Sequence, residues 1–201
     1  MKLIVISHPE TFCDEQQITD AIFDEGLKYF HLRKPLFSEH EMEQFITRIS
    51  EKNYHKIILH SHYRLIEKYN LKGAHVNLQM LTLREKSKSK SEHTSLSLHS
   101  LNEIEHCNLK FDYAFLSPVF DSISKIGYKS TLDLHVVQKF LHKNKDTKII
   151  ALGGVDEEKI ELVKELGFSG IALLGAVWQS SNPVEKFKRI KTACFTSDIK
   201  L

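Results

Sequence analysis

The sequence lacks a long apolar run. The apolar stretch near the N-terminus covers only the four residues 3–6, whereas a membrane span needs roughly 20 apolar residues, and a secretory signal also needs a longer apolar region. We therefore expect neither, and we expect a cytoplasmic protein with no membrane partner.

Cysteines are few and unpaired in pattern. Cys13, Cys107 and Cys194 are odd in number and far apart, and no C-x-x-C motif occurs. This pattern gives no disulfide framework and predicts free thiols in a reducing compartment.

The chain also lacks an excess of one charge. Its formal net charge is +2, and its Lys and Arg residues are spread along the chain among acids. We therefore expect no nucleic-acid partner. The length of 201 residues fits one domain over residues 1–201.

Short apolar runs alternate with helical patterns along the whole chain. Alternation of this kind predicts parallel β-α-β units, and eight of them predict a compact (β/α)8 TIM barrel with eight parallel strands. An open doubly wound sheet is the alternative, but its glycine-rich turn usually follows the first strand, and residues 7–10 contain no glycine. The expected strands are 3–6, 29–32, 56–59, 74–76, 95–98, 113–116, 148–152 and 170–174; the expected helices are 16–26, 38–50, 63–69, 99–107, 132–142, 156–167 and 183–193.

Glycines instead follow the last two expected strands. Gly153 and Gly154 end the seventh strand, and Leu174 and Gly175 end the eighth. Glycine lets a phosphate approach backbone N–H groups, and a following helix N-terminus favours an anion. Barrels commonly bind phosphate at this place. Tight turns without a ligand are the alternative explanation.

Polar residues follow the second and sixth strands. By period two, His31 and Arg33 point to the same side, which we expect to be the barrel mouth, where Arg33 contacts phosphate or pyrophosphate. A structural ion pair of Arg33 is the alternative. The loop after the sixth strand carries Ser122, Ser124 and Lys125, which suit an anionic oxygen cluster, although a solvated loop fits as well.

Histidines also follow the third strand, in the order His60-Ser61-His62. An H-x-H pair suggests a metal, but no third ligand is evident, and we expect no metal there. His75 and His99 also end strands, and we expect them to pack or cap rather than to catalyse.

Five segments together resemble the thiamine phosphate synthase/TenI family. The resemblance extends over roughly residues 3–191. The segments are H-L-R-K-P (31–35), L-S-L-H-S-L-N-E (96–103), D-Y-A-F-L-S-P-V-F-D-S-I-S-K (112–125), I-I-A-L-G-G-V (149–155) and G-I-A-L-L-G-A-V (170–177).

The resemblance implies a barrel enzyme of thiamine biosynthesis. Such a synthase joins a hydroxymethylpyrimidine diphosphate to a thiazole phosphate and releases pyrophosphate, so the implied partners are small phosphorylated substrates. The oligomeric state stays open, a homo-oligomer included. The resemblance assigns substrate contacts to Ser97, Ser122, Ser124, Arg33 and Lys125, and the thiazole phosphate to Gly153, Gly154, Leu174 and Gly175.

This chain departs from the synthase pattern in the half that holds pyrophosphate. The synthase pattern has Gln where His31 stands, an Asn-Asp pair where His60-Ser61 stands, and an acid near Met80. The resemblance implies Mg²⁺ as cofactor, but its usual Asp ligands are absent. Pro35 stands where the synthase pattern has a second lysine that binds pyrophosphate, and the adjacent Lys34 is a candidate to take its place.

Three functions remain open on this basis. A divergent synthase fits the loop of Ser122, Ser124 and Lys125 and also Pro118, since the tautomerase branch has a catalytic His at that place. A TenI-type thiazole phosphate tautomerase fits His31, with His31 or His60 transferring the proton. A non-catalytic binder of thiazole or thiamine phosphate is the third. We favour the synthase, with Arg33, Lys125 and His31 as catalytic residues and His60 and Lys34 among those that bind substrate.

Overall fold

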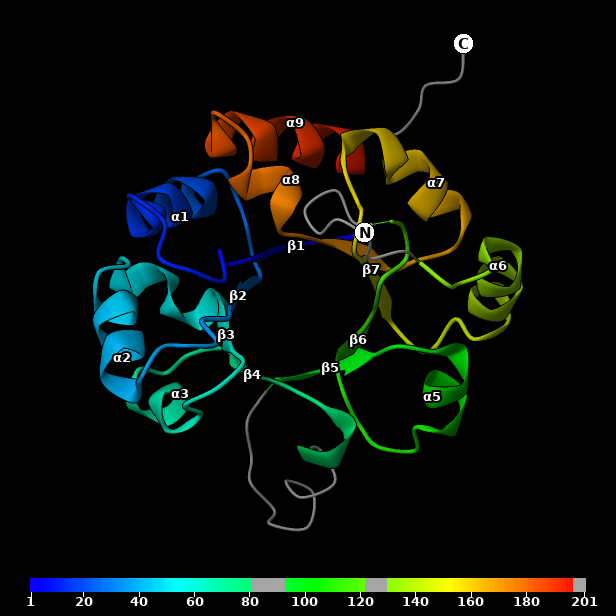
Figure 1. Cartoon of the computed structure of the whole chain (residues 1–201), viewed down its shortest axis with the longest axis horizontal. Coiled ribbons are helices and arrows are strands. Elements are labelled where there is room, and N and C mark those ends of the chain that lie inside the picture. The colour runs from blue at the N-terminus through cyan, green and yellow to red at the C-terminus, as the bar shows by residue number, and fades with distance from the viewer. Residues whose placement is uncertain (81–92, 122–129, 197–201) are drawn as a thin grey trace.

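The structure, a computed structural model, describes residues 1–80, 93–121 and 130–196. Its eight strands form a closed barrel in the order β1 to β8, and every neighbouring pair is parallel. Figure 1 looks down on the ring, with the helices outside the strands. The strands are β1 (Lys2–Ile6), β2 (Phe30–Leu32), β3 (Ile57–Leu59), β4 (Gly73–Val76), β5 (Thr94–Leu98), β6 (Tyr113–Leu116), β7 (Ile149–Leu152) and β8 (Gly170–Leu173). The predicted (β/α)8 barrel is confirmed.

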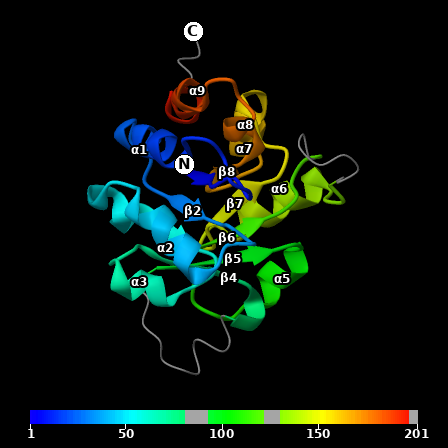
Figure 2. The ribbon, with the colours of Figure 1, turned by 60° about the vertical axis from the view of Figure 1, so that its left-hand side comes forward.

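Helices cover the outside of this barrel. In Figure 2, α1, α2 and α3 lie on one side of the strands, and α5, α6 and α7 lie on the other. The α-helices are α1 (Glu15–Asp24), α2 (Glu39–Thr47), α3 (Arg64–Lys68), α5 (Leu101–His106), α6 (Leu134–Lys143), α7 (Ile160–Glu165), α8 (Gly175–Trp178) and α9 (Pro183–Phe195), with 3-10 helices η1 (Glu51–Lys56) and η2 (Glu157–Lys159). Within the described ranges, no helix is both long and apolar enough to cross a membrane.

Local sequence signals explain where several helices begin. Ser38 caps α2 through a capping box with Glu41, as predicted: its Oγ accepts from the Glu41 N–H, and the Glu41 carboxylate accepts from the Ser38 N–H. Pro183 begins α9, where its missing N–H leaves no helical bond unmade. Three short elements were not predicted from the sequence: the four-residue helix α8 and the 3-10 turns η1 and η2.

Two apolar clusters result from the alternation of side chains along the strands. The larger lies between the strands and the helices, and the smaller fills the barrel interior. The interior cluster consists of Ile4, Ile6, Ile58, Tyr113, Phe115, Ile150 and Ala172. His31 on β2 also faces the barrel interior. It is fully buried, and its ring centroid lies 4.8 Å from that of Phe115. The interior is therefore apolar at one level and carries histidine at the next.

A side chain from α8 forms a hydrogen bond with the end of β1, next to β8 in the barrel. Trp178 is buried, and its Nε1 donates to the carbonyl of Ile6 at the end of β1 over 2.7 Å. This bond fixes α8 directly after β8. It therefore places Leu174 and Gly175, which begin the helix, at the carboxyl end of the barrel.

Candidate functional site

Three histidines converge at the carboxyl end of the barrel. His31 comes from β2, His60 follows β3, and His75 comes from β4. The rings of His60 and His75 stack with centroids 4.2 Å apart, and His31 lies 5.1 and 5.2 Å from them. His31 and His75 are buried and His60 is half-buried, so the cluster begins at the mouth and extends into the barrel.

Hydrogen bonds connect these rings to hydroxyl groups on the next strands. His31 Nδ1 bonds with His60 Nε2 over 2.9 Å, and His31 Nε2 bonds with the Tyr113 hydroxyl over 2.6 Å. His75 Nδ1 bonds with Ser95 Oγ over 2.9 Å, and His75 Nε2 bonds with Ser97 Oγ over 2.7 Å. Two chains of hydrogen bonds therefore run through the barrel, one from His60 through His31 to Tyr113 and one from Ser95 through His75 to Ser97.

All three imidazoles are held in the neutral form. Burial lowers the pKa of His31 and His60 well below 6.5, and it lowers that of His75 to about 3. The positive charge of Arg33 adds to this effect on both His60 and His75. Neutral imidazole has one N–H and one free nitrogen, so each ring both donates and accepts.

Arg33 lies at the mouth beside this cluster, as the alternation from His31 predicts. Its charge acts on His60 and His75, while the residue itself is exposed. Ser7 holds its backbone: Ser7 Oγ accepts from the Arg33 N–H over 2.8 Å and donates to the Arg33 carbonyl over 3.0 Å. The guanidinium is therefore available to an anion, from a fixed backbone position.

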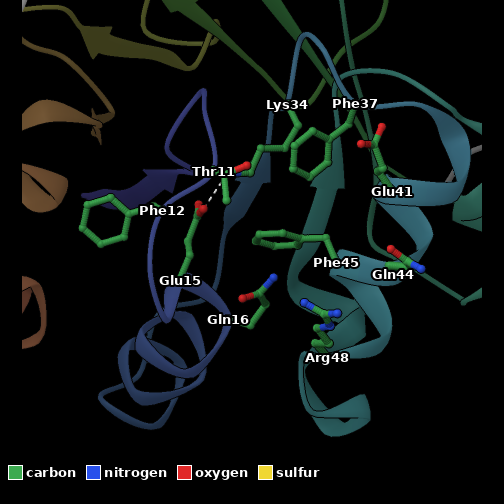
Figure 3. A pocket seen from close by; sticks show the side chains of 10 residues that line it. All are labelled: Thr11, Phe12, Glu15, Gln16, Lys34, Phe37, Glu41, Gln44, Phe45 and Arg48. Carbon is green, nitrogen blue, oxygen red and sulfur yellow. Dashed lines mark hydrogen bonds and ion pairs between the residues drawn. The ribbon is translucent and has the colours of Figure 1, made fainter.

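Lys34 points the other way, into a pocket between α1 and α2 (Figure 3). Its ammonium forms an ion pair with Glu15, donates to the Glu10 carbonyl over 2.7 Å, and lies over the Phe45 ring. The Lys34 side chain is 0% exposed and that of Glu15 is 1% exposed. The structure thus brings Lys34 together with the β1 loop and not with the histidines.

The predicted phosphate glycines lie at the ends of β7 and β8. Gly153 and Gly154 have φ values of +93° and +65°, which L side chains rarely adopt. A Cβ on Gly153 would lie 2.9 Å from Pro118 Cα, so these glycines also let the β6 loop approach closely. Leu174 and Gly175 begin α8, whose first N–H groups have no partner within the helix. A pocket beside Gly175 is also lined by Lys186 and Arg189.

Gly154→Ala is expected to lower the free energy of unfolding by more than about 1 kcal/mol, because the left-handed conformation alone costs an L residue about 1–2 kcal/mol. The added Cβ would also lie 2.3 Å from the Asp121 carbonyl oxygen. Urea denaturation measures the loss. Gly26→Ala is the matched control, since Gly26 has a φ of +95° but its nearest contact is the flexible Lys191 ammonium at 3.3 Å. An equal loss in both variants would contradict the steric argument.

Magnesium does not fit the described residues of this half of the mouth. Mg²⁺ prefers carboxylate and water oxygens, but His60 and Ser61 stand after β3, and Met80 stands beyond β4. The Met80 thioether lies 3.9 Å from the Tyr63 hydroxyl, which itself donates to the carbonyls of His60 and His75. The position near Met80 therefore offers sulfur where the synthase pattern has an acid.

The other predicted site residues divide into two groups. Ser97 contacts His75 at the mouth, while Ser122, Ser124 and Lys125 lie outside the described residues. His62 is turned away and its Nε2 bonds with the Phe37 carbonyl over 2.9 Å, so the H-x-H pair does not act together. Polar roles that were not predicted from the sequence are those of His75, Ser95, Tyr113 and Ser7. Period-two alternation places His75, Ser95 and Ser97 on inward positions and was the available signal.

Comparison with known proteins agrees with this architecture. The family model described as thiamine monophosphate synthase matches residues 3–177. The thiamine-phosphate synthase of Bacteroides fragilis strain YCH46 is 28% identical over 176 residues, which cover 82% of this chain and 86% of that protein. The synthase of Anoxybacillus flavithermus is 28% identical over 120 residues, or 59% of this chain and 55% of that protein.

A solved structure extends the match over nearly the whole chain. The thiamine phosphate pyrophosphorylase from Bacteroides thetaiotaomicron superimposes with a TM-score of 0.79 at 32% identity, covering 96% of this chain and 97% of that one. The resemblance found in the motifs is confirmed by both comparisons. The chain belongs to the thiamine monophosphate synthase family.

Proposed function

We propose that this protein is a thiamine-phosphate synthase that joins a hydroxymethylpyrimidine diphosphate to a thiazole phosphate and releases pyrophosphate. The observation that carries the proposal is the family match over residues 3–177, combined with an exposed Arg33 at the same end of the barrel as the glycine turns after β7 and β8. Two anion sites on one face suit a reaction between two phosphorylated substrates.

Arg33 is assigned to the diphosphate. As the bond from the pyrimidine methylene carbon to the diphosphate oxygen breaks, the electron pair leaves with the pyrophosphate, and charge develops on that leaving group. A guanidinium forms two parallel, charge-assisted hydrogen bonds with such oxygens. Ser7 fixes the backbone from which the Arg33 side chain extends, which reduces the cost of orienting it.

The glycine turns are assigned to the thiazole phosphate. The turn of Gly153 and Gly154 follows β7 at the same end of the barrel, and the first N–H groups of α8 at Gly175 have no partner within the helix. Lys186 and Arg189 border the pocket beside Gly175, where both pair with Glu157 and where Asp156 also lines the wall. Held there, the thiazole presents its ring to the pyrimidine carbon, and the new bond forms as pyrophosphate departs.

The test is an assay of thiamine phosphate from both substrates in the presence of Mg²⁺, with Arg33→Gln as the variant. Loss of a charge-assisted hydrogen-bond pair costs about 1.5–3 kcal/mol, so kcat/KM for the pyrimidine diphosphate should fall roughly 10- to 150-fold. Arg48→Gln is the control, since Arg48 is exposed at the C-terminal end of α2. No thiamine phosphate from the wild-type protein at high concentration would overturn the proposal, and a thermal shift with thiazole phosphate would then indicate a non-catalytic binder.

A further inference from the structure

The three histidines at the mouth place one nitrogen each within 4.8 Å of the other two. His31 lies on β2, His75 lies on β4, and His60 directly follows β3, where its N–H donates to the Leu32 carbonyl over 3.3 Å. Backbone hydrogen bonds of the barrel therefore hold all three positions. We infer that His31, His60 and His75 form a binding site for a divalent transition-metal ion such as Zn²⁺. This site is independent of the proposed synthase activity.

Imidazole nitrogen determines which ions fit. Imidazole suits Zn²⁺, Ni²⁺, Cu²⁺ and Co²⁺, whereas Mg²⁺ and Ca²⁺ need oxygen ligands. The side chains in contact with the three rings are imidazole, hydroxyl and aromatic groups. Burial keeps the rings neutral, and the neutral ring is the form that binds a metal.

Hydroxyl groups already orient two of the three rings. Tyr113 holds Nε2 of His31, while Ser95 and Ser97 hold the two nitrogens of His75. Hydrogen bonds of this kind orient metal-binding imidazoles and fix which nitrogen faces the ion. Tyr113 itself is fully buried, so its hydroxyl has little freedom to move away.

Metal binding requires two small rearrangements. The His31 Nδ1 to His60 Nε2 distance is 2.9 Å, and two nitrogens bound at about 2.0–2.1 Å to a tetrahedral ion lie roughly 3.3 Å apart. The metal would take the place of the proton shared in that bond. The His75 ring, whose plane now makes an angle of 24° with that of His60, must turn out of this stack. It must also release its hydrogen bond to one serine while it keeps the bond to the other.

A fourth ligand position would lie on the solvent side of the cluster. His31 and His75 are buried, while His60 is half-buried and lies beside the exposed Arg33. Three protein ligands with an open fourth position are typical of zinc sites that bind water or a substrate atom. The site therefore takes a metal whose remaining ligand is exchangeable.

The test titrates EDTA-stripped full-length protein with ZnCl₂ by calorimetry, and with CoCl₂ by absorbance. We expect one ion per chain and visible Co²⁺ bands of a tetrahedral nitrogen site. His60→Ala should weaken binding at least tenfold, while His62→Ala, whose ring bonds the Phe37 carbonyl, should leave it unchanged. A large excess of Mg²⁺ should not displace the ion.

Thiol binding is controlled by Cys13→Ser, because Cys13 is exposed. Cobalt–thiolate absorbance in the near ultraviolet, or binding that disappears in Cys13→Ser, would contradict the histidine site. So would an absence of stoichiometric Zn²⁺ binding by the wild-type protein, or undiminished binding by His60→Ala. Circular dichroism of each variant shows that the fold is retained.

Discussion

Lys34→Met should lower the free energy of unfolding by about 3–5 kcal/mol, which is the cost of leaving one partner of a buried ion pair without the other. The Lys34 and Glu15 side chains are 0% and 1% exposed, so water cannot replace the lost ammonium around the Glu15 carboxylate. The whole free energy of unfolding of most domains is only about 5–15 kcal/mol. Denaturation in urea, followed by fluorescence of Trp178, measures the change.

Two further variants separate the ion pair from general effects of substitution. Lys34→Met combined with Glu15→Leu should recover most of the loss, because two apolar side chains then replace two charges. Lys52→Met removes an exposed ion pair with Asp24 and should cost little, since surface pairs are screened by solvent. If Lys34→Met cost no more than Lys52→Met, the structural role of Lys34 would be wrong.

Acid should destabilise the metal-free protein steeply below pH 6.5. The folded-state pKa of His31, His60 and His75 is lowered by burial, to about 3 for His75, while an unfolded histidine has a pKa near 6.5. The unfolded chain therefore takes up protons first, so stability is complete above pH 6.5 and falls as pH drops toward 3. In this range each imidazole lowers the free energy of unfolding by about 1.4 kcal/mol per pH unit, so the three together lower it by about 4 kcal/mol per pH unit.

The measurement is the free energy of unfolding in urea from pH 7.5 to 5.0 with EDTA present. His31→Leu should reduce the slope between pH 6.5 and 5.0 by about one third, whatever its effect on stability at pH 7.5. His55→Asn, at an exposed position on η1, should leave the slope unchanged. A wild-type slope near zero in this range would show that the three rings are not kept neutral.

Much of the barrel could be read from the sequence because each strand carries its own signal. The apolar run 113–116 is observed as β6 with the same bounds, and the Ser38–Glu41 capping box begins α2 as predicted. The four residues of α8 could not be predicted, because a helix of one turn has no periodicity to detect. What fixes α8 is the bond from Trp178 to the Ile6 carbonyl, between residues 172 positions apart.

The site was predictable only in part, for a related reason. Alternation places His31 and Arg33 inward, and the same rule places Lys34 outward, where the structure has it. The convergence of His75 with Ser95 and Ser97 depends on the register of β4 against β5, which pairs His75 with Ser95. Register between strands comes from the closure of the whole barrel, so no local pattern in the sequence carries it.

The hydrogen bonds from His60 through His31 to Tyr113 have a direction. Neutral His31 has one N–H and one free nitrogen, so if it donates on one side it must accept on the other. If His60 Nε2 accepts from His31, then His31 accepts from the Tyr113 hydroxyl; if His60 donates, His31 donates to that hydroxyl. A group at the mouth that reverses the bond of His60 therefore reverses the bond at Tyr113, from the end of β3 to β6 and without any change of charge.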